Sequence, residues 1–292
     1  MATSALKLQI TAGACQWVNT WQTRSGDQYL KSTRPRTILN EKKFLGSGGK
    51  LSENVAREKV YQQQKRSLVR SRQSPSGAGQ MLVYVPPHPL IKHWMAVLRN
   101  KDTPQPIFRS ALAELGRCLI YEALRDWLPM IETQVETPCG VADVAFIDPT
   151  EPVKVVPILR AGLVLIENST TLLPAMQTYH LGYARDERTL KPRLYLNKLP
   201  PSFPQDSRIL LADPMLATGG TIVAAIEELR SRGADVRLMR VVSAVCAPPA
   251  LKLLSERYPG LKVYTGIIDP DLNDYGFIVP GLGDAGDRSF GT

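Results

Sequence analysis

Residues 213–221 place a carboxylate, two threonines and a pair of glycines within one short stretch. Gly219 and Gly220 remove side chains where the backbone has to curl, so that successive N–H groups can converge on one anion. The threonine hydroxyls add donors, and a helix expected to begin near Ile222 contributes unpaired N–H groups and the positive end of its dipole. The stretch therefore predicts a phosphate site at the start of a helix.

Asp213, at the entrance of this predicted anion site, cannot itself bind a phosphate. A carboxylate at that place makes sense when the ligand also presents hydroxyls or a metal ion. Phosphate together with hydroxyls describes a ribose 5-phosphate better than a nucleoside triphosphate, because no lysine follows the glycines to reach a γ-phosphate. The alternative is a plain strand-to-helix turn with a threonine cap.

Arg160 is a second candidate, because it follows the apolar run 153–159 and precedes two small residues, Ala161 and Gly162. The small residues would let a diphosphate approach the backbone, and the guanidinium offers a fork of donors to it. The alternative for Arg160 is a surface ion pair.

The stretch 281–287 is rich in glycine and aspartate. Exposed backbone amides and carbonyls in such a loop suit the flat edge of a pyrimidine, which alternates carbonyl and N–H groups. A simple surface turn or a cation site fits the same composition.

The elements that must position these residues alternate between strands and helices. Apolar, partly β-branched runs predict strands, and apolar residues at helical spacing predict helices. The predicted strands are 153–159, 209–212, 238–245 and 263–268; the predicted helices are 108–128, 222–232 and 249–258, with a further helical pattern after Gly162 through Leu173. This order implies βαβ crossovers and a largely parallel sheet, whose ligands bind beyond the carboxyl ends of the strands.

Charge is unevenly distributed along the 292 residues. Residues 1–80 hold 14 Lys and Arg against 4 Asp and Glu, whereas the remainder holds 22 against 23, so only the first segment has an electrostatic reason to meet a polyanion. This basic, acid-poor segment resembles an organelle transit peptide, particularly a plastid one. A basic arm for nucleic acid and a disordered tail without function are the alternatives. Elsewhere no apolar run approaches the roughly 18–20 residues of a membrane span.

Four cysteines without C-x-x-C spacing indicate neither a zinc site nor a disulfide framework, and we expect buried free thiols. The three histidines fit no standard metal-binding or catalytic set. The charged run 183–198 is typical of a solvated hairpin.

Three separated motifs resemble those of the type I phosphoribosyltransferases. They are residues 156–163, 213–221 and 276–288, and the resemblance covers most of the chain after Met81. It is similar above all to the uracil-specific members of plants and cyanobacteria, which share the sequence Pro214-Met215-Leu216. The resemblance implies an α/β fold for residues 81–292, with a largely parallel twisted sheet flanked by helices, a flexible arm and a small hood. Ala212 stands where many members carry a second acid, so Asp213 would contact the ribose alone.

The resemblance also implies roles for particular residues. Asp213, Arg160 and Asp284 match catalytic positions. The positions that match binding of 5-phospho-α-D-ribose 1-diphosphate (PRPP) are Arg160, Arg185, Asp213, Pro214, Met215, Leu216, Ala217, Thr218, Gly219, Gly220, Thr221 and Asp284. The positions that match uracil binding are Ile278, Gly283, Asp284 and Ala285. Arg185 lies in the run 183–198, which corresponds to the flexible arm over the active site.

The activity implied by the resemblance is transfer of ribose 5-phosphate from PRPP to uracil, giving UMP and diphosphate. Magnesium is expected to arrive with PRPP, with no direct protein ligand, and GTP is a candidate activator. We expect a homo-oligomer, either a dimer or a tetramer, that binds these small molecules and neither a membrane nor nucleic acid. The leader predicts location in the chloroplast, with the cytoplasm as the alternative. Two other functions stay open: a phosphoribosyltransferase for another base, and a regulatory protein that binds PRPP or UMP and contacts RNA.

Overall fold

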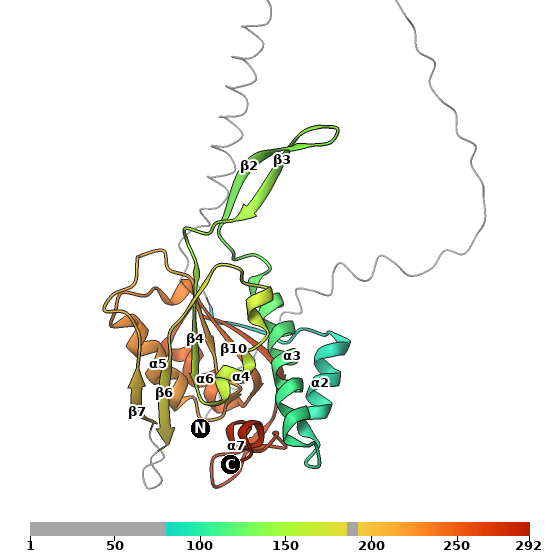
Figure 1. Cartoon of the computed structure of the whole chain (residues 1–292). Helices are drawn as coiled ribbons and strands as arrows, with labels where there is room; N and C mark the ends of the chain where they lie inside the picture. Colours follow the sequence, from blue (N-terminus) through green and yellow to red (C-terminus); the bar gives the residue numbers. More distant parts are fainter. Residues whose placement is uncertain (1–79, 186–191) are drawn as a thin grey trace, which may run out of the picture. The chain divides into compact units, whose positions relative to one another are not determined.

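Strand β10 (Met239–Cys246), which is buried along its whole length, lies within a nine-stranded sheet (Figure 1). The main path of this sheet runs β1-β11-β10-β8-β4-β6-β7, while β5 pairs with β4 and β9 pairs with β10. All these pairs are parallel except β6–β7. The structure describes residues 80–185 and 192–292, within a unit that spans Ala78–Thr292. The predicted leader lies outside the described residues except for its last residue.

The remaining elements of the unit have the following bounds. The strands are β1 (Leu82–Tyr84), β2 (Met130–Thr137), β3 (Gly140–Ile147), β4 (Val153–Leu159), β5 (Met176–Thr178), β6 (Leu181–Arg185), β7 (Pro192–Asn197), β8 (Ile209–Ala212), β9 (Met215–Leu216), β11 (Lys262–Ile268), β12 (Asp271–Leu272) and β13 (Ile278–Val279). The helices are α2 (Pro89–Arg99), α3 (Gln105–Leu124), α4 (Ala161–Leu165), α5 (Gly220–Arg230), α6 (Pro248–Arg257) and α7 (Ala285–Phe290), with short 3₁₀ turns η2 (Ser169–Thr171) and η3 (Val236–Leu238).

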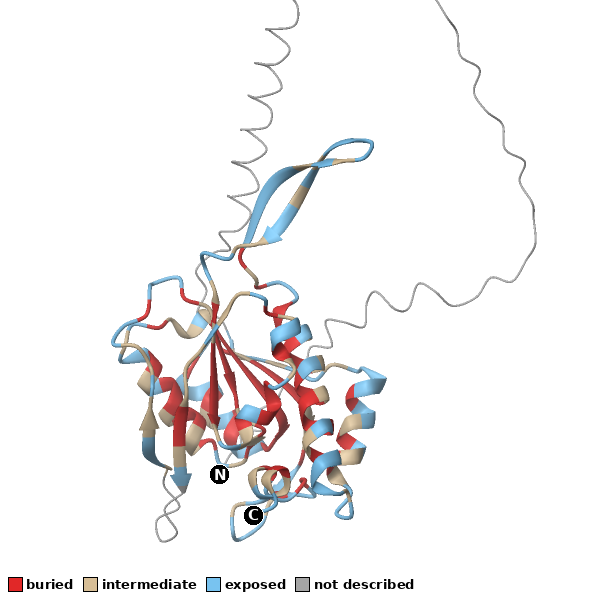
Figure 2. Cartoon of the chain, viewed as in Figure 1, coloured by how far each residue is buried: buried red, intermediate tan, exposed pale blue. Residues whose placement is uncertain are grey.

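Successive residues of the central strands pack into two different cores, because side chains alternate across a sheet. Val155 and Leu210 face a core formed with α2, α3 and α4. Val156 and Leu211 face a core formed with α5 and α6. The sheet is therefore covered on both faces, and Figure 2 shows its central strands buried between helices. Burial on both faces explains why these strands are continuous apolar runs in the sequence.

The predicted α/β architecture with a largely parallel sheet is confirmed, and the bounds of β4 and β8 are those predicted. The helix bounds differ from the prediction, those of α6 by only one residue at each end. Helix α3 begins at Gln105, three residues earlier, because the φ angle of Pro104 and Pro106 suits a helix start, and it ends at Leu124. The helical pattern predicted to reach Leu173 is only the short α4 followed by η2. Helix α5 begins at Gly220 rather than near Ile222.

An exposed hairpin, β2–β3, was not predicted. Its strands form a separate two-stranded antiparallel sheet that extends away from the rest of the unit (Figure 1). Large apolar side chains such as Val141 and Phe146 are exposed on it, so the strands carry no alternating buried face from which a sequence pattern could arise. Cys139, in the turn that joins β2 to β3, is exposed, which corrects the expectation of a buried thiol there.

Two glycines bring α4 against its neighbours. A Cβ at Gly116 of α3 would lie 1.8 Å from the carbonyl oxygen of Leu165 in α4. A Cβ at Gly162 of α4 would lie 2.4 Å from the carbonyl oxygen of Ala212 in β8. Both distances are far inside van der Waals contact, so only glycine fits. Helix α4 is thus held against the central sheet at the point where β4 ends.

None of the helices in residues 80–185 and 192–292 combines the length and apolar character needed to span a membrane.

Candidate active site

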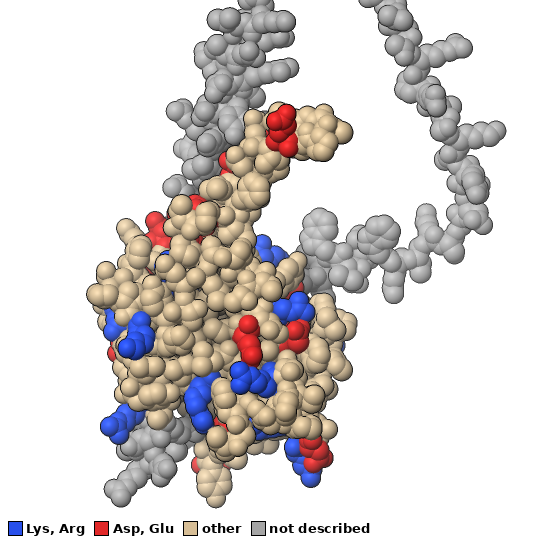
Figure 3. Space-filling model, in the orientation of Figure 1, with Lys and Arg blue, Asp and Glu red and all other residues tan. Residues whose placement is uncertain are grey.

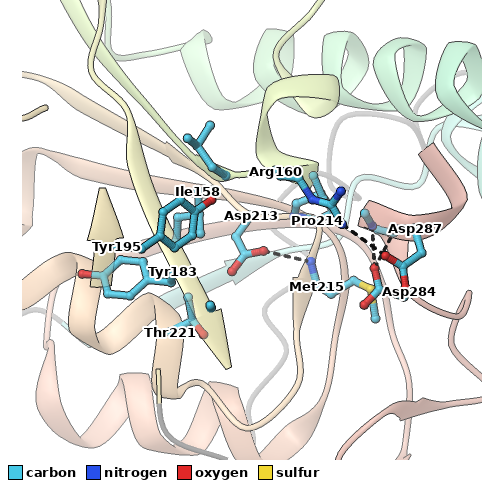
Figure 4. Close-up of a pocket in the computed structure, with 15 residues that line it drawn as sticks. Ile158, Arg160, Tyr183, Tyr195, Asp213, Pro214, Met215, Thr221, Asp284 and Asp287 are labelled. Atoms are coloured by element: carbon cyan, nitrogen blue, oxygen red, sulfur yellow. Dashed lines mark hydrogen bonds and ion pairs between the residues drawn. The ribbon is translucent and has the colours of Figure 1, made fainter. Parts of the chain in front are cut away.

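A pocket with a volume of about 420 Å³ opens beyond the carboxyl ends of β4 and β8 (Figure 4). This is the edge of a parallel sheet at which ligands bind in α/β folds. It is lined by Ile158, Leu159, Arg160, Ala161, Tyr183, Ala184, Tyr195, Asp213, Pro214, Met215, Thr221, Asp284, Ala285, Gly286 and Asp287. Residues from the three sequence motifs therefore meet in one cavity, because β4 and β8 are neighbours in the sheet and α7 packs against α3 and α4.

Asp213 follows β8 directly and lies in the interior of this pocket. In Figure 4 it lies between Tyr183 and Tyr195 on one side and Arg160 and Asp284 on the other. Its Oδ1 accepts a weak hydrogen bond, 3.5 Å, from the N–H of Met215. Burial raises the pKa of Asp213 to about 7, because the charged carboxylate is poorly solvated there and the single backbone bond offsets little of that cost. A carboxyl so placed gains from ligand hydroxyls that hydrogen-bond to it, because they replace part of the lost solvation.

The loop after Asp213 is more ordered than the sequence indicates. Met215–Leu216 form β9, which pairs with the end of β10, and the loop then turns at Gly219, the N-cap of α5. Gly219 has φ of 84°, and an added Cβ would lie 3.1 Å from Cα of Ala250, so this position requires glycine. Among the described residues no side chain caps α5, which leaves the first N–H groups of the helix available to an anion.

Gly220 differs from Gly219, which corrects the idea that both are needed for the curl of the backbone. It is the first helical residue of α5, and an added Cβ would lie 3.6 Å from Cδ of Pro192, an ordinary contact. Its lack of a side chain is thus not required by the fold. The space in front of Gly220 is what a phosphate approaching the helix start would use.

Arg160 lies at the rim of the pocket with about half of its side chain exposed. Its Nη2 is 3.2 Å from Oδ1 of Asp287, and the guanidinium also contacts Oγ1 of Thr292 at 3.4 Å. An exposed pair of this kind contributes little to stability, so a diphosphate could replace Asp287 at small cost. The surface ion pair that was the alternative role for Arg160 is therefore present, and it does not prevent the same guanidinium from binding a diphosphate.

Gly162 has a different role from the one predicted. It is buried, lies outside the pocket lining and packs on Ala212, so its small size serves the contact between α4 and β8 rather than the approach of a diphosphate. Ala161, in contrast, does line the pocket.

Asp284 is the N-cap of α7. Its Oδ1 accepts hydrogen bonds from the N–H groups of Gly286, at 2.7 Å, and Asp287, at 3.0 Å. This bond pattern is a standard helix cap and fixes the carboxylate at the pocket wall. Both Oδ1 bonds come from its own helix, so the other oxygen is the one that can face a ligand.

Several predicted residues do not line the pocket. Leu216 and Ile278 are buried in the two cores, so their side chains cannot reach a ligand in the pocket and only their backbone groups could. Ala217, Thr218, Gly219, Gly220 and Gly283 also lie outside the lining. Arg185 ends β6, and its side chain lies outside what the structure describes.

Six lining side chains were not predicted as site residues: Ile158, Leu159, Tyr183, Ala184, Tyr195 and Asp287. The tyrosines come from β6 and β7, which pair antiparallel and hold the two ends of the charged run, while its middle, residues 186–191, lies outside the described residues (Figure 4). The hydroxyl of Tyr183 is buried without a hydrogen-bond partner among the described residues, and desolvation raises its pKa to about 12. The alternation of residues across these strands could have indicated which side chains face the pocket.

Charges of both signs are interspersed on the face shown in Figure 3. That distribution agrees with the near balance of acid and base after residue 80 and gives this face no basic stripe for a polyanion. In the described part of the chain, no three His, Cys, Asp or Glu side chains are grouped as a metal site.

Comparison with known proteins identifies the family. The family model for uracil phosphoribosyltransferase matches residues 85–292. A uracil phosphoribosyltransferase of Nicotiana tabacum is 65% identical over 212 residues, which cover 73% of this chain and 95% of the tobacco protein. The chloroplastic enzyme of Arabidopsis thaliana is 57% identical over 244 residues, which cover 84% of this chain and 82% of that protein.

A solved structure shares the fold. The AQ2163 protein of Aquifex aeolicus superposes with a TM-score of 0.66 at 38% identity, covering 72% of this chain and 98% of that protein. The family model covers every residue that lines the pocket. The chain therefore belongs to the uracil phosphoribosyltransferase family.

Proposed function

We propose that this enzyme transfers ribose 5-phosphate from PRPP to N1 of uracil, giving UMP and diphosphate. The observation that carries the proposal is the meeting of Asp213, Arg160 and Asp284 in one pocket at the carboxyl edge of the sheet. In the reaction the bond between C1 and the diphosphate oxygen breaks, and its electron pair leaves with the diphosphate. N1 of uracil bonds to C1 and loses its proton to water.

The 5-phosphate is assigned to the start of α5. There the backbone N–H groups at Ala217, Thr218, Gly219 and Gly220, the hydroxyl of Thr221 and the positive end of the helix dipole can hold an anion. Asp213, with Pro214, Met215 and Leu216 fixing the backbone beside it, would accept hydrogen bonds from the ribose hydroxyls. Orientation of this kind accounts for a large part of the rate in group transfer.

The diphosphate is assigned to Arg160, with Arg185 as a second cation from the β6–β7 hairpin. Negative charge grows on the leaving group as the bond breaks, so a fixed guanidinium stabilises the transition state more than the ground state. Magnesium bound with PRPP would neutralise diphosphate charge. It would arrive with PRPP and take no direct ligand from the protein, in keeping with the lack of a grouped metal site among the described residues.

Uracil is assigned to the loop that ends at α7. Backbone groups of Ile278 and Gly283 and the segment Asp284 and Ala285 would contact the base, and Asp284 also faces the PRPP side. The pocket lining at Asp284 and Ala285 supports this assignment.

We also propose that residues 1–80 direct the chain to the chloroplast. The chloroplastic protein of Arabidopsis thaliana aligns with 244 residues of this chain, whereas the tobacco protein aligns with 212. The match to the chloroplastic protein therefore extends further along this chain. Import of the full chain into isolated chloroplasts, compared with residues 81–292, tests this role, and equal import of both would refute it. Homo-oligomerisation and activation by GTP stay predictions.

The activity is tested by incubating the full chain with magnesium, PRPP and each common nucleobase in turn. UMP from uracil alone is the expected result. A product with another base instead would point to a different acceptor, and no product with any base would refute the transferase function.

A further inference from the structure

Asp269 is a buried carboxylate outside the pocket, directly after β11. Asp269 as a whole is only 3% exposed to solvent. One oxygen, Oδ2, accepts the N–H of Gly281 at 2.9 Å, and the other, Oδ1, lies 2.6 Å from Nη2 of Arg99 at the end of α2. Burial of a charge is costly unless it is paired and hydrogen-bonded, and here both oxygens are satisfied.

Arg99 completes a bracket around the same glycine. Its Nη1 donates to the carbonyl oxygen of Gly281 at 3.3 Å, so the two polar backbone groups of Gly281 are held by the two members of one ion pair. Gly281 has φ of 58°, and an added Cβ would lie 2.1 Å from the carbonyl oxygen of Ile278. The pair therefore fixes a tight left-handed turn.

Arg288 holds the next residue of the turn. Its Nη1 donates to the carbonyl oxygens of Leu282, at 2.7 Å, and Leu98, while Nη2 donates to that of Asn100 at 2.6 Å. The guanidinium also stacks 4.2 Å from the centre of the Phe108 ring. Arg99 and Arg288 thus fasten residues 281 and 282 to the end of α2. The exposed Gly283 and Asp284 follow immediately.

We propose that Asp269 is a positioning residue for uracil, acting through its bracket on Gly281; this rests on the proposed contact of residues 283–285 with the base. A loop that recognises a flat ligand with backbone groups needs those groups held within a fraction of an ångström. Gly283 has φ of 76° and no side chain to pack, so it depends on the clamped residues before it. Release of Gly281 should loosen the uracil contacts while the PRPP contacts of 213–221 stay in place.

The test compares Asp269→Ala and Asp269→Asn with Asp126→Asn in the full chain. Asp126 pairs at 2.8 Å with the buried Arg240 and contacts Lys262 at the start of β11. It therefore controls for loss of an ion pair about 20 Å away, at the other end of the same strand. Asp269→Ala is expected to raise KM for uracil about tenfold or more while KM for PRPP changes less than about twofold. Asp269→Asn keeps an acceptor for Gly281 and should lie between wild type and Asp269→Ala. Asp126→Asn should leave both KM values near wild type.

An equal rise of both KM values, or a uracil KM no higher than that of Asp126→Asn, would overturn the proposal. If the wild-type chain makes no UMP, the proposed function fails first, and the uracil role fails with it. Amide hydrogen exchange at Gly281 and Gly283 separates the two failures. Faster exchange in Asp269→Ala than in Asp126→Asn would show that the bracket positions the loop whatever the ligand.

Discussion

Two glycine-containing loops face the same pocket and are held in different ways. The phosphate loop, residues 213–221, is fixed by its own neighbours: β8 before it, the β9 pairing inside it and α5 after it. The base loop, residues 278–287, is fixed by three charged side chains: Arg99 at the end of α2, Asp269 after β11, and Arg288 of α7, which also donates to the carbonyl oxygens of residues 98 and 100.

The two loops should therefore lose their geometry under different conditions. Secondary structure is cooperative, so the phosphate loop should keep its geometry until β8 or α5 unfolds. The base loop depends on a few partly buried ionic contacts, and the loss of one charge leaves its partner uncompensated. Uracil affinity should therefore be lost through substitutions remote from the ligand more readily than PRPP affinity.

The largest effect is expected from Asp213→Asn, which tests the chemical part of the phosphate loop without disturbing its backbone. We expect kcat/KM to fall about 100-fold, because the amide cannot accept two ribose hydroxyls as a carboxylate does. The variant should unfold at no lower temperature than wild type at pH 8, since the ionised carboxylate is the costly form in a buried site. Asp235→Asn, the same change of charge at the N-cap of η3, where it removes the ion pair with Arg237, serves as control and should keep its activity. Near-normal kinetics of Asp213→Asn would break the assignment.

A smaller effect is expected from Arg160→Ala. KM for PRPP should rise about 30-fold, the loss of one charge-assisted contact, with little change in stability because Arg160 is exposed. The control is Arg208→Ala, which removes an exposed pair of similar length, 3.0 Å to Glu151, at the opposite end of the sheet. Similar PRPP constants for the two variants would contradict the role of Arg160.

Gly281→Ala and Gly220→Ala sharpen the comparison directly. Alanine at 281 meets the Ile278 carbonyl and adopts a left-handed φ, so uracil KM should rise about tenfold and unfolding free energy should fall by about 1–2 kcal/mol. Alanine at 220 fits a helix, so stability should hold while KM for PRPP rises. Chemical denaturation and steady-state kinetics measure both. A loss of stability in Gly220→Ala together with unchanged stability and uracil KM in Gly281→Ala would contradict this description of the two loops.

The smallest effect concerns pH. With a pKa near 7, the ionised fraction of Asp213 grows between pH 6.5 and 7.5, so kcat/KM for PRPP should rise about threefold over that interval. The folded pKa lies above the ordinary carboxyl value of 3.8, so the protonated carboxyl favours the folded state at low pH and this contribution is lost as pH rises through about 7. Asp213→Asn, measured in parallel, should lack this rise; an identical profile would assign the titration to another group.

The sequence was sufficient where the signal is local. The bounds of β4 and β8 follow from apolar runs that end at Arg160 and Asp213, and the parallel sheet then brings those two residues together. The start of α5 was misplaced by two residues, because glycines that read as loop can also begin a helix when the N-cap is left-handed.

The sequence was not sufficient where partners are distant. Asp269 contacts a residue 170 positions away, and Arg288 contacts one 190 positions away, so no spacing rule could pair them. Ile278 was assigned to the base by resemblance, and its side chain proved to belong to the core. The β2–β3 hairpin escaped prediction because it buries neither of its faces.

The contact between Gly116 and Leu165 has a consequence for any survey of inactive variants. Bulk at position 116 would push α4 off α3 and shift Arg160, which α4 follows directly in the chain. A screen for cells that no longer salvage the base should recover substitutions at 116, and at 162 for the same reason, although neither residue touches a substrate.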